Sequence, residues 1–130
     1  MGKKIRVLVA DDEQDFRQLM TVWLKSKGYS VQAVPDGKSA LDAIKADPPD
    51  IVFLDINMPG MDGNEALKKI RSFNKTIPVI IISACLEKFD IKMSARHKVS
   101  GVFYKGEDLD KGLALLQAAL RSHKNLKRAD

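Results

Sequence analysis

Short apolar runs alternate along the chain with longer amphipathic stretches. Residues 51–54 and 79–82 are continuously apolar, which is typical of central strands in a parallel sheet that helices cover on both faces. Residues 29–34 alternate between apolar and polar types, as expected for an edge strand. Together with two further runs, the pattern predicts five strands, at residues 4–10, 29–34, 50–54, 78–82 and 101–104.

The clearest helical pattern follows the first predicted strand. Its apolar residues recur with helical spacing and form one stripe that we expect to face the core. These residues are Phe16, Leu19, Met20 and Trp23. Acidic residues gather at the start of this stretch and lysines at its end, which suits the helix dipole, and Gly28 is a good terminator.

Four more helices are expected, which makes five in all. The second begins at residues 35–37, the third follows residues 61–63, and the fourth, at about residues 86–96, has the sparsest apolar pattern. The last carries a stripe of leucines, at Leu109, Leu113, Leu116 and Leu120. Strict alternation of strands and helices predicts right-handed crossovers and a doubly wound parallel sheet.

Length and composition are those of one folded domain. The 130 residues are 45% apolar and 30% charged, which favours a single domain with its own core. We expect the domain to cover residues 1–123 and residues 124–130 to form a basic tail or the start of a tether. No apolar run is long enough to cross a bilayer and no signal-peptide core is seen. The single cysteine, Cys85, excludes an internal disulfide and favours the reducing cytoplasm.

The formal net charge of +5 raises the question of an acidic partner. The basic residues are spread along the chain, with mild clusters near residues 88–98 and 121–128. No basic patch interleaved with aromatic residues and no zinc-finger spacing is present. We therefore favour a solvated basic surface over direct binding to nucleic acid or to a membrane.

Chemically active side chains follow four of the five predicted strands. They are Asp11, Asp12, Asp55, Ser83, Ala84 and Lys105, with Ala84 accompanying the serine. In a doubly wound sheet the binding site lies beyond the carboxyl ends of the strands. We therefore expect three carboxylates, one hydroxyl and one ammonium group to converge at that edge.

Each of these residues has an ordinary structural explanation when it is taken alone. Asp11 or Asp12 could cap the first helix, Asp55 could start a turn, Ser83 could be a loop hydroxyl, and Lys105 a surface charge. The explanation is weaker for the whole group, because three neighbouring acids repel one another and burial raises their pKa. A divalent cation together with Lys105 is the natural compensation.

The donor set consists of oxygen atoms, with no histidine or cysteine nearby in the pattern. It therefore favours Mg²⁺ or Mn²⁺ over zinc. A carboxylate beside a metal, a lysine and a hydroxyl suits phosphoryl transfer, since aspartate can form an acyl phosphate. Phosphorylating Asp55 would replace one negative charge by about two. New hydrogen bonds would meet the excess charge, and Ser83 is the donor that we expect to move.

Several segments match a known family closely. They are residues 9–13 (VADDE), residues 50–63 (DIVFLDINMPGMDG), residues 82–84 (ISA) and Lys105. On these segments the chain resembles the receiver domain of bacterial two-component response regulators over almost its full length. The resemblance implies an α/β fold, a flavodoxin-like three-layer sandwich with five parallel strands in the order 2-1-3-4-5 and five helices.

The resemblance also implies roles for the residues at the strand ends. Asp55 would accept a phosphoryl group from a histidine of a sensor kinase or phosphotransfer protein. Mg²⁺ would be bound by carboxylates and one backbone carbonyl, contributed by Asp12, Asp55 and Asn57, with Asp11 assisting through water. Ser83 would be the switch hydroxyl and Lys105 the lysine that pairs with the phosphate. The fourth helix, fifth strand and fifth helix would form the surface for an output domain or downstream protein.

Two positions depart from the pattern of that family. The family has an aromatic residue three positions before the lysine, where this chain has Val102. It also has a proline after the lysine, commonly with a cis bond, where this chain has Gly106. A cis bond without proline costs about 2.5–4 kcal/mol, so we expect this loop to be either trans or strained. Transmission of the signal to the surface need not follow the family's standard route.

Three other functions compete with a phosphorylation switch. A degenerate receiver would bind partners without phosphorylation, although its acidic site is intact. An aspartyl-nucleophile phosphatase of the haloacid-dehalogenase type would need a second aspartate where Asn57 stands, and a cap domain. A nucleotide-binding module would need a glycine-rich phosphate loop after the first strand, which is absent. We therefore expect a regulatory domain with at most slow self-dephosphorylation rather than an enzyme.

Overall fold

The structure is a computed structural model that describes residues 4–84 and 96–122. These residues form five strands and four helices. In chain order they are β1 (Arg6–Ala10), α1 (Gln14–Ser26), β2 (Ser30–Val34), α2 (Gly37–Ala46), β3 (Ile51–Asp55), α3 (Gly63–Phe73), β4 (Val79–Ser83), β5 (Gly101–Tyr104) and α5 (Leu109–Ser122).

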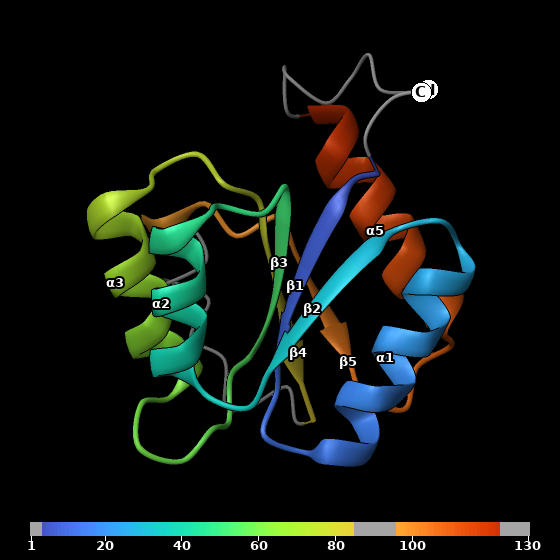
Figure 1. The fold of residues 1–130 in the computed structure, drawn as a ribbon, viewed down its shortest axis with the longest axis horizontal. Coiled ribbons are helices and arrows are strands. Elements are labelled where there is room, and N and C mark those ends of the chain that lie inside the picture. Colours follow the sequence, from blue (N-terminus) through green and yellow to red (C-terminus); the bar gives the residue numbers. More distant parts are fainter. Residues whose placement is uncertain (1–3, 85–95, 123–130) are drawn as a thin grey trace.

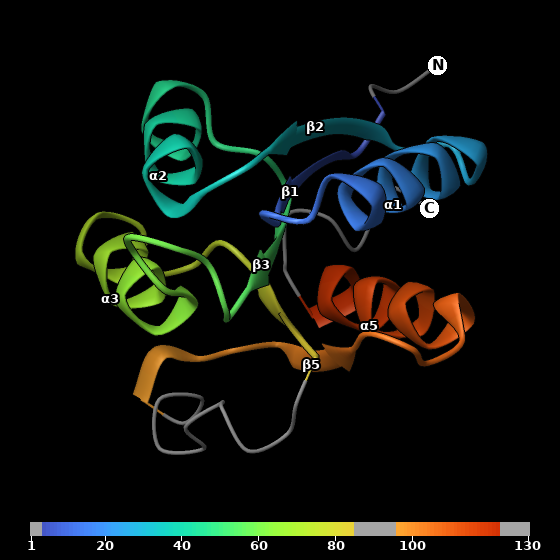
Figure 2. The same cartoon turned by 90° about the horizontal axis from the view of Figure 1, so that it is seen from below.

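The strands form one parallel sheet at the centre of the molecule (Figure 1). Their order is β2-β1-β3-β4-β5 and every neighbouring pair is parallel. Figure 2 shows α1 and α5 on one face of the sheet and α2 and α3 on the other. The predicted α/β class, parallel pairing and strand order are thus confirmed.

The two faces of the sheet carry separate hydrophobic cores, because successive strand residues point to opposite sides. In β1, Val7 and Val9 pack with α1 and α5, whereas Leu8 and Ala10 pack with α2 and α3. Strands β3 and β4 are buried along their whole length, which explains their continuously apolar sequences. Each fully buried aliphatic side chain contributes about 1.5–3 kcal/mol to folding.

Strand β2 lies at the edge of the sheet, as its alternating sequence predicts. Val34 is its only buried residue, and Ser30, Gln32 and Ala33 are exposed. The strand pairs only with β1, in the register Val7↔Val31. Its polar positions therefore lie toward solvent and do not interrupt either core.

Helix α1 packs on the sheet through a different line of residues from the one predicted. Met20 and Leu24 are fully buried, and Phe16 and Trp23 are partly buried against the same core. Leu19 is 49% exposed, so its predicted place in the core-facing stripe is wrong. The sheet covers a narrower arc of the helix than the apolar residues span, and Leu19 lies outside that arc.

Two predictions fall on residues outside the described ranges. The fourth helix was expected at about residues 86–96, and of these only Arg96 is described. The basic tail at residues 124–130 also lies outside the described ranges. No helix among the described residues has both the length and the apolar character that a membrane span requires.

Candidate functional site

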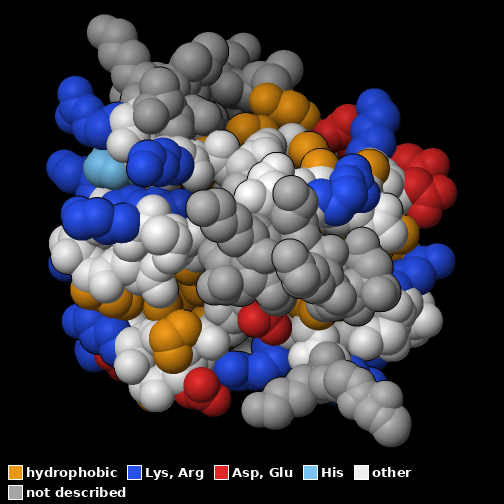
Figure 3. Space-filling view, turned by 90° about the horizontal axis from the view of Figure 1, so that it is seen from above, with side chains coloured by type: hydrophobic (Ala, Val, Ile, Leu, Met, Phe, Trp, Pro, Cys, Tyr) orange, Lys and Arg blue, Asp and Glu red, His pale blue; other side chains and the backbone are white. Residues whose placement is uncertain are grey.

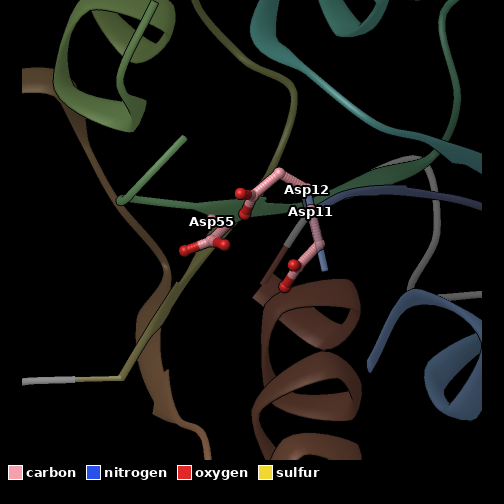
Figure 4. A group of neighbouring side chains, drawn as sticks. All are labelled: Asp11, Asp12 and Asp55. Atoms are coloured by element: carbon pink, nitrogen blue, oxygen red, sulfur yellow. The ribbon is translucent and has the colours of Figure 1, made fainter. Parts of the chain in front are cut away.

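Three aspartates meet beyond the carboxyl ends of β1 and β3 (Figure 4). Asp11 and Asp12 directly follow β1, and Asp55 is the last residue of β3. One carboxylate oxygen from each lies within 4.8 Å of the others. Asp11 and Asp55 are buried, and Asp12 is exposed. The sheet topology therefore brings together the three acids that the sequence predicted to converge.

The two buried aspartates are held in the same way by the backbone. Asp11 Oδ1 accepts a hydrogen bond from the N–H of Glu13 at 2.8 Å, and Asp55 Oδ1 accepts one from the N–H of Asn57 at 3.0 Å. Each bond closes a turn over two residues. Helix α1 is preceded by Glu13 as its N-cap and has no side-chain cap bond. Asp11 and Asp12 are therefore not helix caps, which was their ordinary alternative.

Lys105, which follows β5, extends its ammonium group into the acid cluster. Nζ lies 3.0 Å from Asp11 Oδ2 and 3.3 Å from Asp55 Oδ2. It also pairs with Glu13, and it lies 4.8 Å from the ring centroid of Phe16. Only 14% of the lysine side chain is exposed. One cation therefore links the ends of β1, β3 and β5.

Three contacts of this site were not predicted from the sequence. Glu13 and Phe16 contact Lys105, and the guanidinium of Arg17 donates to the carbonyl oxygen of Asp11 at 2.7 Å. Glu13 was counted among the acids at the helix start and within the matched segment 9–13, without a role at the site, and Phe16 was counted only as a core residue. The third acid of the sequence Asp-Asp-Glu was the available signal for Glu13.

The electrostatic balance of the site favours a proton on Asp55 more than in water. Burial is the main cause, and the charge of Asp11 adds to it, while the Asn57 N–H and Lys105 oppose it. Together these effects raise the pKa of Asp55 to about 6. For Lys105, burial alone would lower the pKa, but hydrogen bonds to Glu13 and Asp11 and the nearby carboxylates raise it overall. The lysine is therefore a permanent cation.

The remaining predicted residues lie at the same edge of the sheet. Ser83 is the buried last residue of β4, and its carbonyl oxygen accepts the backbone N–H of Lys105 at 2.9 Å. Ala84 follows it and is exposed. Asn57 is exposed in the loop after β3. All the residues that the sequence analysis placed at strand ends therefore border one site. The roles assigned to them stay predictions.

The start of α3 fixes the position of the Asp55 backbone. A Cβ atom on Gly63 would lie 2.5 Å from both the carbonyl oxygen of Asp55 and the Cα of Ile56. The Gly63 N–H donates to the Ile56 carbonyl at 2.9 Å, and Asp62 caps the helix by accepting the N–H of Glu65 at 2.9 Å. Glycine is thus required because the helix end and the strand end touch.

The loop after β5 is trans where the family commonly has a cis proline bond. No cis peptide bond occurs in residues 4–84 and 96–122. Gly106 has a φ of 95°, a left-handed conformation that the proline ring forbids. Val102 is partly buried against the core on the α2 and α3 face. The loop still delivers Lys105 to the acids without either family residue.

The residues present fit a hard divalent cation. Asp11 Oδ2 is buried and lies 3.0 Å from the Lys105 ammonium as an ion pair, but no described residue donates a hydrogen bond to it. The donors are carboxylate oxygens, which Mg²⁺ and Mn²⁺ prefer. One lysine alone leaves the charge of the three aspartates and Glu13 unmatched.

The fold and the site define a doubly wound α/β domain with an acidic cluster at the carboxyl ends of its strands. The family described as "Response regulator receiver domain" matches residues 7–117. The chain therefore belongs to the receiver domain family of response regulators. Receiver domains are regulatory phosphoacceptor switches of two-component signal transduction, and this is the function of the class to which the chain belongs.

Curated relatives agree with this assignment. The chain is 34% identical over 125 residues to the response regulator MprA of Mycolicibacterium vanbaalenii. It is 33% identical over 121 residues to the transcriptional regulatory protein CseB of Streptomyces coelicolor. These alignments cover 95% and 93% of this chain but 51% of each relative. The chain thus spans about half the length of the curated relatives it matches.

Solved structures also match over nearly the whole chain. Chemotaxis protein CheY4 of Vibrio cholerae superposes with a TM-score of 0.82 at 29% identity, covering 91% of this chain and 100% of that one. The response regulator TrrA of Thermotoga maritima, solved in complex with Mg²⁺ and BeF, has a TM-score of 0.83 at 29% identity with the same coverage. Both are similar in fold to the structure described above.

Proposed function

We propose that Asp55 is the phosphoacceptor of this receiver domain. The observation that supports it most is the position of its carboxylate, which is nearly buried beside two other acids with Oδ2 3.3 Å from Lys105. The donor would be a phosphohistidine of a sensor kinase or phosphotransfer protein. In the reaction an oxygen of Asp55 bonds to phosphorus while the bond from phosphorus to the histidine nitrogen breaks.

The other residues of the site would bind and orient the reacting groups. Asp11, Asp12 and Asp55, with the carbonyl of Asn57, would hold Mg²⁺ or Mn²⁺. When bound, the ion supplies positive charge beside the phosphoryl oxygens. The Asn57 N–H holds Asp55 Oδ1, which leaves Oδ2 for the phosphoryl group. Lys105 would then exchange its carboxylate partners for a phosphoryl oxygen.

Phosphorylation would be read at the surface through β4 and β5. The phosphoryl group adds negative charge and three acceptor oxygens. Ser83 would donate to it from the end of β4, and the carbonyl of this residue is already bonded to the Lys105 backbone at 2.9 Å. Movement at these two residues would therefore reach β5 and α5. We propose that this face, with the predicted fourth helix, contacts an output domain or downstream protein.

A direct test uses Mg²⁺ and acetyl phosphate, with the phosphorylated fraction resolved on a phosphate-affinity gel. The wild type should be phosphorylated and Asp55→Asn should not. Asp62→Asn is the matched control, because Asp62 caps α3 outside the acid cluster and asparagine also caps helices. Equal phosphorylation of Asp55→Asn would refute the proposal. Steady phosphate release from phosphomonoesters would instead indicate a phosphatase.

A further inference from the structure

A basic groove lies near the amino ends of the strands, at the end of the sheet opposite the acid cluster. Its main hollow, of about 420 Å³, lies between the end of α3 and the segment that leads into β5. The lining residues are Lys68, Arg71, Ser72, Lys75, Arg96, His97 and Lys98. Five of them are cationic and none is acidic. We call these seven residues the basic groove.

The groove combines two segments that are far apart in the sequence. Lys68 and Arg71 lie one turn apart on α3, and Lys75 lies two residues beyond its last residue. Residues 96–98 supply the opposite side. A second hollow, of about 250 Å³, shares three of these cations and continues along the starts of β4 and β5 toward the end of α5. Figure 3 shows Lys and Arg side chains gathered around a histidine on this side of the molecule.

Arg71 is the buried centre of the groove. It is 7% exposed, and Nε donates to the His97 carbonyl at 2.7 Å. Nη1 and Nη2 donate to the carbonyls of Asn74 at 3.1 Å and Lys98 at 3.4 Å. Within the described part of the chain, two of the five guanidinium N–H groups have no partner, and no carboxylate pairs with the guanidinium. A buried cation without a counter-charge is costly, so an anion in the groove would relieve it.

Two neighbours of Arg71 are also in unfavourable states: one lacks a hydrogen bond and the other has a strained backbone. His97 Nε2 is buried and has no hydrogen-bond partner among the described residues, which is uncommon in folded proteins. Lys98 has a φ of 55°, a left-handed conformation that glycine or asparagine adopts at lower cost. A lysine is thus kept at a position that disfavours it. Strained and unsatisfied positions of this kind cluster at ligand-binding sites.

We propose that the basic groove binds a small polyanion that carries two or more phosphate groups. Guanidinium and ammonium groups are the usual phosphate ligands, and the hollow has the size of a small-molecule site. A nucleic-acid strand is disfavoured, because the lining has no Phe, Tyr or Trp on which a base could stack. The ligand would act on this receiver domain from the edge opposite Asp55, independently of its phosphorylation.

The test titrates the unphosphorylated full chain, without Mg²⁺, with inorganic tripolyphosphate in a calorimeter. We expect saturable binding of one ligand per chain. The double variant Lys68→Gln with Lys98→Asn should weaken binding by about tenfold or more, because it removes two charged contacts with the phosphate groups and each contact contributes to the affinity. The matched control, Lys25→Gln with Lys27→Gln, removes two exposed lysines at the end of α1 and should bind like the wild type.

Three outcomes would overturn the proposal. The first is no saturable binding of tripolyphosphate, and the second is an equal loss of affinity in both double variants, which would indicate only the net charge. The third is tighter binding of a short polyglutamate peptide than of tripolyphosphate, which would assign the groove to an acidic protein segment. A rise in the pKa of His97 on adding tripolyphosphate, followed by NMR, would support it. Burial and the charges of Arg96, Arg71 and Lys68 lower that pKa in the free protein.

Discussion

At the scale of single residues, burial and the charge of Lys105 have opposite effects on the pKa of Asp55. Asp55 is buried beside Asp11, and one lysine ammonium lies within 3.3 Å of both. Burial outweighs this compensation, so the folded protein binds a proton at Asp55 more tightly than the unfolded chain does. The residue that is proposed as the nucleophile is therefore held at a cost in stability, as functional residues commonly are.

This cost gives a pH dependence of known sign. The folded-state pKa of Asp55 is raised to about 6, against about 4 in an unfolded chain. The stabilisation from its proton is complete below about pH 4 and is lost as the pH rises through about 6. At pH 7 without metal, Asp55→Asn should therefore raise the free energy of unfolding by about 1–3 kcal/mol.

Urea unfolding of both proteins in EDTA, at acidic and neutral pH, measures this effect. The gain from Asp55→Asn should shrink as the pH is lowered through the pKa of Asp55 and vanish near pH 4. An equal gain in the free energy of unfolding at both pH values would show that burial does not raise the pKa of Asp55.

At the scale of elements, the ends of the strands position the acidic residues, and glycines allow helices to pack closely against the strands. Gly63 at the start of α3 touches the backbone of β3. In α5, a Cβ atom added to Gly112 would have ring carbons of Phe103 as its nearest neighbours, at 3.4 Å. The same substitution at these two helical glycines should therefore have opposite effects.

We expect Gly63→Ala to destabilise the protein by about 1–3 kcal/mol, because its Cβ would overlap backbone atoms. Gly112→Ala should be neutral or stabilise it by up to about 1 kcal/mol through helix propensity. Thermal or urea unfolding compares the two variants directly. Equal losses would show that Gly63 is present for another reason than its contact with β3.

Val102 is predicted to matter for the readout of phosphorylation more than for phosphorylation itself. It lies on β5 and is partly buried against the core on the α2 and α3 face. Val102→Tyr should leave the rate of phosphorylation by acetyl phosphate unchanged and alter the phosphorylation-dependent NMR shifts of β5 and α5. A parallel change in rate and shifts would place Val102 within the reacting site instead.

Much of the element scale could be predicted from the sequence. The apolar runs at residues 51–54 and 79–82 located β3 and β4 to within one residue, because both faces of these strands are buried. The role of Leu19 could not be predicted, since helix periodicity does not show how wide an arc the sheet covers. The contact of Lys105 with Glu13 joins residues 92 positions apart, and only the folded chain brings them together.

At the scale of the whole molecule, opposite charges occupy opposite edges of one sheet. The acid cluster lies at the carboxyl ends of the strands, and the basic groove lies at the amino ends of β4 and β5. The net charge of +5 was interpreted from the sequence as a solvated surface. The groove itself could not be predicted. Residues 96–98 fall within a mild basic cluster of the sequence, but the cations at residues 68–75 are distant from it in the chain, and only folding brings the two sides together.

The acid cluster should make folding stability depend on divalent cations. A ligand that binds only the folded state adds about 2.7 kcal/mol when present at a hundred times its Kd. Adding Mg²⁺ should therefore raise the unfolding midpoint of the wild type and not that of Asp12→Asn. Asp12 is exposed, so its replacement should leave the metal-free midpoint in place. An equal rise in both proteins would indicate a general salt effect.

The central claim is that Asp55 itself carries the phosphoryl group, and chemical mapping of the modified residue tests it most directly. After reaction with Mg²⁺ and acetyl phosphate, borohydride reduces an aspartyl phosphate to homoserine, which peptide mass spectrometry can locate. The peptide that contains Asp55 should show homoserine at that position, and unphosphorylated protein should show none. Homoserine at Asp11 or Asp12, or at no aspartate of a phosphorylated sample, would contradict the account.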